Sequence, residues 1–150
     1  MSQSLWRIQL RLTYIHLTGN MIHIYLSGQI KNKKQLEQFA YDVLFSMVGN
    51  VTHDVDIEVR VKKDIGGQMG FCWGDSEHIV IELAKGNSVA GEYLEFGYDE
   101  VVVTLAHELV HAKQHILSEK SSDCEREPNE LQYKLVERFW NPHQLNATAV

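Results

Sequence analysis

The five residues from His107 to His111 read His-Glu-Leu-Val-His. Two histidines four positions apart on a helix lie one turn apart on the same face, so both imidazoles can reach one metal ion. Glu108 lies beside the first histidine and can accept a proton from metal-bound water. This spacing is the sequence form of a zinc hydrolase site, with His107 and His111 as metal ligands and Glu108 as the general base.

The residues around the motif favour a helix. From Asp99 to Leu117 apolar side chains recur at helical spacing, whereas the histidines occupy the more polar side. Asp99 and Glu100 come where the helix should begin, and acidic residues are favourable near that positive end. We therefore expect an amphipathic helix that presents its histidines on one face.

A catalytic zinc usually takes three protein ligands and one water. A polar connection from Ser118 to Asn129 precedes a second periodic segment, Glu130 to Trp140, and Pro128 suits the first turn of a helix. The second helix can fold back beside the first, which makes Glu130 the predicted third ligand. Three further carboxylates of this region are alternatives: Glu125, Glu127 and Glu137.

The pair of signals resembles the gluzincin class of zinc metallopeptidases, in which two histidines and a downstream glutamate hold zinc. The motif His107-Glu108-x-x-His111 and the later pair Asn129-Glu130 carry this resemblance. It implies that His107, His111 and Glu130 bind Zn²⁺ and that Glu108 is the base for peptide hydrolysis.

The layout upstream of the motif also looks like that of SprT-like metallopeptidases and their small phage- or plasmid-borne relatives. The matching segments are Gly70–Cys72, His78–Leu83, Thr104–His107, His111–Gln114 and Pro128–Glu130. The resemblance covers roughly the C-terminal half of the chain, and only the His-Glu-x-x-His part is specific.

Two departures from these families concern the ligands. SprT-like proteins take a third histidine, for which this chain offers His115 and His143; His115 continues the line of the first two ligands and projects too far along the helix axis. Larger gluzincins often place an aspartate one turn after the ligand glutamate, where this chain has Lys134. The outer partner that a ligating histidine needs is therefore unassigned.

The expected chemistry is hydrolysis by metal-activated water without a covalent intermediate. A hydrogen-bond donor to the developing oxyanion would assist it. Four residues are candidates by chain position: Arg126, Tyr133, Arg138 and His143.

The remaining sequence predicts a scaffold of strands and one more helix. Leu5–Leu17 and Met21–Leu26 are expected to form a hairpin across Thr18-Gly19-Asn20, followed by a helix at Lys31–Val48 and a strand at Val55–Val61. Gln68–Trp73 and His78–Leu83 are predicted as strands joined by Gly74-Asp75, and Ala84–Tyr98 as a long flexible connection.

This order predicts an α+β, zincin-like domain with a mostly antiparallel sheet, a backing helix, an active-site helix and a ligand-bearing C-terminal helix. With 150 residues, 44% of them hydrophobic, the chain suits one domain over 1–150, with a tail from about residue 141. His78–Leu83 is the strand expected to pair with an extended substrate.

Composition narrows the location and the partners. The chain has neither a long apolar run nor the core of a signal peptide, which favours the cytoplasm, and Cys72 and Cys124 are then expected as free thiols. A net charge of −6 argues against nucleic acid as a partner. We therefore expect a protein or peptide substrate; the alternatives are a zinc hydrolase of a non-peptide amide bond and a catalytically silent metal-bound binding module.

Overall fold

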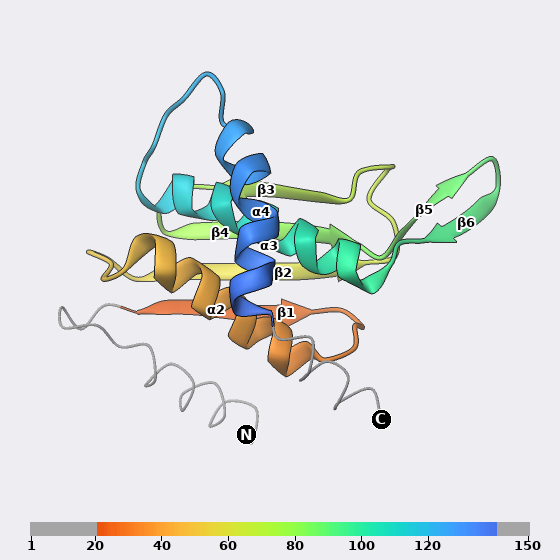
Figure 1. Cartoon of the computed structure of the whole chain (residues 1–150), viewed down its shortest axis with the longest axis horizontal. Helices are drawn as coiled ribbons and strands as arrows, with labels where there is room; N and C mark the ends of the chain where they lie inside the picture. The colour runs from red at the N-terminus through yellow and green to blue at the C-terminus, as the bar shows by residue number, and fades with distance from the viewer. Residues whose placement is uncertain (1–20, 141–150) are drawn as a thin grey trace.

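The computed structural model describes residues 21–140, and the domain that they form is α+β (Figure 1). Its helices are α2 (Lys33–Val48), α3 (Tyr98–Ile116) and α4 (Arg126–Phe139). Its strands are β1 (Ile22–Ser27), β2 (Val55–Lys62), β3 (Gly70–Gly74), β4 (His78–Ala84), β5 (Gly86–Val89) and β6 (Glu92–Glu95).

The main sheet has the order β1-β2-β4-β3, and the prediction of a mostly antiparallel sheet is wrong. Strand β2 runs parallel to both β1 and β4, and only β3 is antiparallel to its neighbour. The helix between β1 and β2 explains the first parallel pair, because a helical crossover carries the chain back to the start of the next strand. Strands β2 and β4 are parallel because β3, which runs the opposite way, lies between them in the chain. Alternating polarity indicates half-buried strands but not their direction.

Strands β3 and β4 form the predicted hairpin across Gly74 and Asp75. The carboxylate of Asp75 accepts hydrogen bonds from the backbone N–H groups of Glu77 and His78, each at 2.8 Å. Gly74 has a φ of 142°, and a Cβ there would lie 2.2 Å from the carbonyl oxygen of His78. The turn therefore needs glycine at this position. The hairpin places β4 inside the sheet and leaves β3 at its edge.

The predicted flexible connection from Ala84 to Tyr98 is instead a second hairpin, β5–β6, which projects away from the main sheet in Figure 1. Its turn residues Ala90 and Gly91 both have positive φ, 53° and 82°, as a tight two-residue hairpin turn requires. Alanine rarely adopts that conformation, so the Ala-Gly pair is a weaker turn signal than Asn-Gly.

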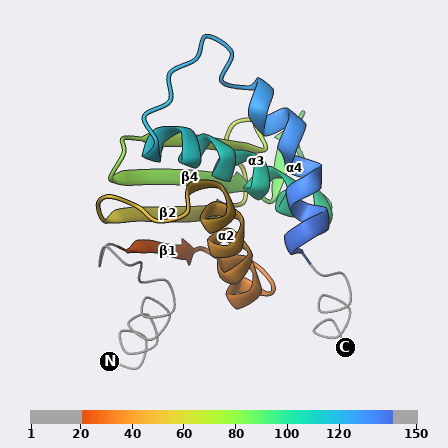
Figure 2. The ribbon, with the colours of Figure 1, turned by 60° about the vertical axis from the view of Figure 1, so that its left-hand side comes forward.

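Helices α2 and α3 lie on one face of the main sheet, and α4 packs against α3 (Figure 2). The alternate residues of β1, β2 and β4 that face these helices are buried. Helix α2 contributes Leu36, Phe39, Ala40, Val43 and Leu44 to the same core. The core therefore fills the space between the sheet and the helices, as the period of each segment predicts.

Helix α4 begins at Arg126, about one turn before the periodic segment that starts at Glu130, and Pro128 lies in its first turn as predicted. Pro128 is the third residue of the helix, where its missing N–H leaves no backbone hydrogen bond unmade. A proline in the first turn therefore marks the start of α4 better than the apolar periodicity, which begins only at Leu131.

Some predictions fall outside the described residues. These are the first strand of the N-terminal hairpin and the tail from 141, and the single domain over 1–150 stays a prediction. Met21–Leu26 is confirmed as β1, which pairs in parallel with β2. Within residues 21–140, no helix combines the length and the apolar character needed to cross a membrane.

Shortening a buried side chain on the central strand β2 should test the packing of the core. Ile57 lies on β2 and is 0% exposed, so Ile57→Ala should lower the free energy of unfolding by about 2–5 kcal/mol through lost burial and a residual cavity. Leu94 on β6 is 58% exposed, and Leu94→Ala is the matched control, expected within about 0.5 kcal/mol of the parent chain. Chemical denaturation measures both; equal losses would contradict this core.

Candidate metal centre

Helix α3 carries the motif and separates two kinds of side chain. Leu105 and Leu109 are fully buried, whereas the side chains of His107 and His111 keep 17% and 12% of their surface exposed. The two imidazole rings lie one turn apart, with their centroids separated by 5.1 Å. The predicted pairing of these two residues on one helical face is confirmed.

The carboxylate of Glu125, at the start of α4, contacts both imidazole rings. Nε2 of His107 lies 3.0 Å from Oε2 of Glu125, and Nε2 of His111 lies 2.9 Å from Oε1 of the same side chain. Within residues 21–140, these three side chains form the one group of at least three His, Cys, Asp or Glu whose atoms are close enough to share a metal ion. Two imidazoles and one carboxylate are a ligand set that zinc commonly takes.

The other ring nitrogens are also held. Nδ1 of His107 lies 2.8 Å from Oε1 of Gln132, and Nδ1 of His111 lies 3.0 Å from Oε1 of Gln114. Each imidazole therefore faces an oxygen acceptor on both nitrogens, although a neutral ring has only one N–H to donate. If each neutral ring donates its Nδ1–H to an amide oxygen, both Nε2 lone pairs face the Glu125 carboxylate, and either a proton on each ring or a bound cation relieves the repulsion between them. One metal ion would satisfy both contacts.

Glu130, the predicted third ligand, does not join this group. Its carboxylate is exposed and lies 3.1 Å from Nε of Arg126, one turn earlier on α4. Glu125 and Glu130 are five residues apart, which turns Glu130 about 140° around the helix from Glu125. The structure thus brings Glu125, one of the alternatives, to the histidines, because α4 begins one turn earlier than the apolar pattern indicates.

The remaining alternatives also lie outside the group. Glu127 is paired with Lys113, and Glu137 is exposed on α4, two turns beyond Glu130. His115 lines the cleft beyond His111 but is not among the three grouped side chains. Burial lowers the pKa of His115, and the neighbouring His111 lowers it further.

Glu108 lies on the side of α3 that faces β3. It is 6% exposed, and burial raises the pKa of its carboxyl above the usual range; His107 and His111 oppose this shift and Glu125 adds to it. A carboxylate with a raised pKa binds a proton more readily near neutral pH, as a general base must. The predicted base is thus buried at the site, next to both histidines.

A cleft of about 640 Å³ lies between α3, the edge strand β3 and the chain that precedes α4. It is lined by both histidines of the motif, Glu108, Glu125 and residues of β3, including Phe71 and Cys72. Burial raises the pKa of the Cys72 thiol, and Glu108 raises it further, so this thiol is a neutral part of the wall. Cys124, another residue of the cleft wall, is also a free thiol, as predicted.

The three predicted oxyanion donors that lie within residues 21–140 do not line this cleft. Tyr133 is 67% exposed, Arg126 pairs with Glu130, and Arg138 stacks on the ring of Phe139. His143 lies outside the described residues. The cleft wall instead includes other side chains with hydrogen-bond donors, among them Gln68, His115, Lys120 and Ser121, none of which chain position alone distinguishes for this role.

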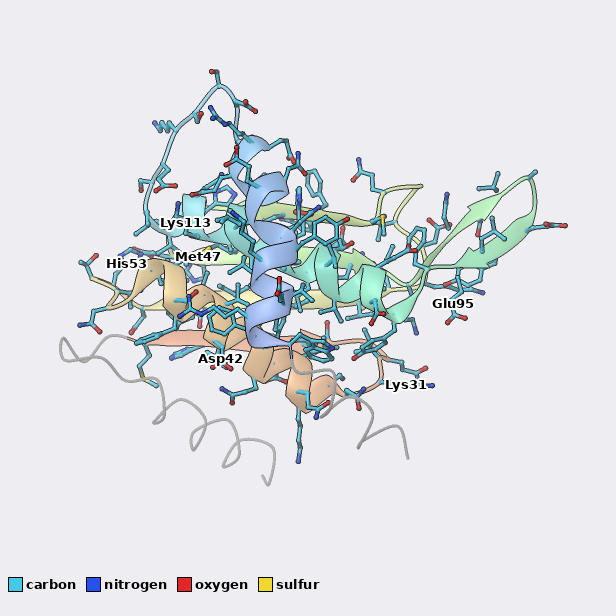
Figure 3. The ribbon with its side chains drawn as sticks, in the orientation of Figure 1. Lys31, Asp42, Met47, His53, Glu95 and Lys113 are labelled. Carbon is cyan, nitrogen blue, oxygen red and sulfur yellow. The ribbon has the colours of Figure 1, made fainter. Side chains whose placement is uncertain are left out.

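The buried side chain of Lys113 links α3 to α4 and to the segment between them, close to the two histidines. Nζ of Lys113 lies 2.8 Å from carboxylate oxygens of both Glu119 and Glu127, and Figure 3 labels this lysine near the end of α3. Burial alone lowers the pKa of Lys113, but these hydrogen bonds outweigh it and raise the pKa. The ion pairs fasten the chain on both sides of Glu125.

The close approach of β3 to the helix depends on Gly70. A Cβ at this position would lie 2.6 Å from Cγ2 of Thr104 and 3.0 Å from Oε2 of Glu108. Any larger residue would therefore push the edge strand away from the proposed base. No feature of the sequence distinguishes this glycine from those in turns, because the contact joins segments over thirty residues apart.

Comparisons with protein-family models, curated proteins and solved structures find no match for this chain.

Gly70→Ala should lower the free energy of unfolding by about 1–3 kcal/mol, because the new methyl overpacks the contact with α3. Thr104→Ser removes the nearest atom, Cγ2, while keeping the hydroxyl that donates to the Glu100 carbonyl. Gly70→Ala should therefore lower the free energy of unfolding by less in the Thr104→Ser chain than in the parent chain. Thermal or urea denaturation measures the cycle, and strictly additive losses would contradict the proposed contact.

Lys113→Met should cost about 1–2 kcal/mol of stability through the lost charge-assisted hydrogen bonds. Because the folded-state pKa of Lys113 is raised, this contribution is fully present below the ordinary lysine pKa and disappears as pH rises through the raised value. The gap between parent and variant should close in strongly alkaline buffer. Lys134→Met, at an exposed position of α4, is the control; a gap that persists at high pH would contradict the assignment.

Proposed function

We propose that this chain is a zinc-dependent peptidase, in which His107, His111 and Glu125 hold the metal and Glu108 is the general base. One observation carries the proposal: both imidazoles point Nε2 at the same carboxylate while their Nδ1 atoms face amide oxygens. With both rings neutral, this arrangement lacks a positive charge between the two Nε2 atoms and the Glu125 carboxylate. A divalent ion meets it without a proton on either ring.

The ligand set also suits hydrolytic chemistry. Bound there, zinc would lower the pKa of a water molecule and polarise a substrate carbonyl, and the two neutral imidazoles and one carboxylate leave it a net positive charge. Glu125 is exposed and lines the cleft, so a substrate in the cleft can reach the proposed metal site. Other divalent metals share this preference for nitrogen and oxygen ligands, so metal analysis has to identify the ion.

Glu108 moves the proton. It accepts one proton from the attacking water as the new C–O bond forms, and it delivers this proton to the departing amine as the C–N bond breaks. The carboxylate is then restored, and water has been added across the peptide bond. Burial against β3 holds Glu108 beside the cleft and raises its pKa toward the range that this exchange needs.

The edge strand supports a peptide as the substrate. Among residues 21–140, β3 has β4 on one side and no strand on the other, so its outer backbone groups can pair with an extended chain. The strand that the sequence favours for this role, His78–Leu83, is β4, which lies inside the sheet with neighbours on both sides. The assignment therefore moves to β3, which also lines the cleft.

Metal binding should separate the two candidate third ligands. The purified chain should bind one zinc ion, and Glu125→Ala should weaken binding by more than the roughly 10- to 100-fold that loss of an outer partner costs. Glu130→Ala is the matched control and should leave the affinity unchanged, because its carboxylate pairs with Arg126. Competition with a chelating dye measures these affinities. The reverse ranking of the two variants would restore Glu130 as the ligand.

Glu108→Gln should keep zinc and lose peptidase activity by about 10²- to 10⁴-fold, since the amide cannot accept the proton. Mass spectrometry of a peptide mixture incubated with zinc-loaded protein detects the cleavage products. Full activity in this variant would remove Glu108 from the mechanism. Zinc binding without cleavage of any peptide by the parent chain would contradict the peptidase assignment and leave a metal-bound binding module.

A further inference from the structure

Gln114 lies between the two halves of the candidate metal centre. It follows His111 by three residues on α3 and so projects from the same side of the helix. Its amide oxygen Oε1 lies 3.0 Å from Nδ1 of His111, and its amide nitrogen Nε2 lies 3.0 Å from the carbonyl oxygen of Cys124. Cys124 immediately precedes Glu125. One side chain thus contacts a ligand on α3 and the backbone beside the ligand that precedes α4.

The chemistry of these contacts fixes the direction of each hydrogen bond. A backbone carbonyl can only accept, so the group that faces Cys124 must be the amide NH₂. The opposite end of the amide, the oxygen, then faces His111 and can only accept. Nδ1 of His111 must therefore donate, and in the neutral ring the Nε2 lone pair then points to Glu125. The carbonyl of Cys124 in this way sets the tautomer of a ring on another segment.

The position of Gln114 also restrains the polar segment between the helices. Helix α3 ends at Ile116, and Ser118 then adopts a positive φ of 53° that turns the chain away. Backbone N–H of Glu119 donates to the carbonyl of Gln114 at 2.8 Å. The returning end of the segment is held by the Gln114 side chain at Cys124, so the same residue contacts both the departing and the returning chain.

We propose that Gln114 is a positioning residue that couples the two sides of the metal centre: its amide oxygen orients the His111 ring, and its amide nitrogen holds the backbone that places Glu125. This inference rests on the proposed metal-binding function. Gln132 contacts His107 from α4 through its amide oxygen, whereas Gln114 links a histidine ligand to the chain that carries the carboxylate ligand.

Two substitutions separate the two roles. Gln114→Leu removes both hydrogen bonds and should weaken zinc binding by roughly 10- to 100-fold, the usual cost of losing an outer partner. Gln114→Glu keeps an oxygen acceptor for His111 but cannot donate to the Cys124 carbonyl, and its charge would lie beside Glu127, whose Oε1 is 3.5 Å from the present amide nitrogen. Gln114→Glu should therefore keep the ring orientation and still bind zinc more weakly.

Two measurements test this difference. Chelator competition gives zinc affinities, and NMR of the histidine rings reports the Nδ1–H of His111, which exchanges slowly with water while Gln114 accepts it. We expect that signal in the parent chain and in Gln114→Glu but not in Gln114→Leu, with the Nδ1–H of His107 as an internal reference in all three. Gln38→Leu is the matched control for affinity, because Gln38 is exposed on α2, away from the metal centre, and its amide donates to Asp42 one turn along the same helix.

The outcomes distinguish this inference from the function on which it rests. Unchanged zinc affinity in Gln114→Leu, with binding by the parent chain intact, overturns the role of Gln114 alone. Parental affinity in Gln114→Glu overturns the link through Cys124. A parent chain that binds no zinc overturns both the inference and the proposed metal site. Denaturation curves of the metal-free variants identify any loss that comes from misfolding.

Discussion

Helix α3 has to satisfy two partners at once, and the rest of the structure follows from that constraint. Leu105 and Leu109 must reach the core, while His107 and His111 must face the cleft. The helical period keeps these demands apart, because residues three and four positions apart share a face. Burial of the apolar face fixes the rotation of the helix about its axis. The direction of the histidines is therefore set by the hydrophobic core.

The ion pairs of Lys113 and the amide of Gln114 act on the other half of the site. Glu125 comes from a segment whose side chains from Lys120 to Arg126 are exposed, so apolar burial does little to place it. Polar contacts place it instead, because Lys113 holds Glu119 and Glu127, and Gln114 holds the carbonyl of Cys124. Such contacts are directional, whereas apolar burial is not. A ligand at the start of a helix needs that directionality.

Strand β3 supplies the third wall of the site and differs from the other strands of the main sheet. It is short, it lies at the edge, and it is the one antiparallel member of that sheet. The absence of a side chain at Gly70 lets its backbone lie against Thr104 and Glu108. Burial of Glu108, and hence the rise in its pKa, depends on this close approach.

Much of this protein could be predicted from local patterns. Periods of two and 3.6 residues identified β1, β2, β4, α2 and α3, and the spacing of His107 and His111 placed both on one helical face. These predictions succeed because side-chain direction within an element follows from its own backbone geometry. The α+β class follows from the order of such elements.

The strand directions, the interior position of β4 and the carboxylate that meets the histidines all depend on long-range packing. The first two depend on how the chain crosses between strands, which alternation does not encode. The choice of Glu125 over Glu130 depends on where α4 begins and how it packs on α3, and one helical turn changes which side chain faces the site. Residue types and their spacing identify the side chains that could bind a metal, whereas the packing of distant segments decides which of those side chains come together.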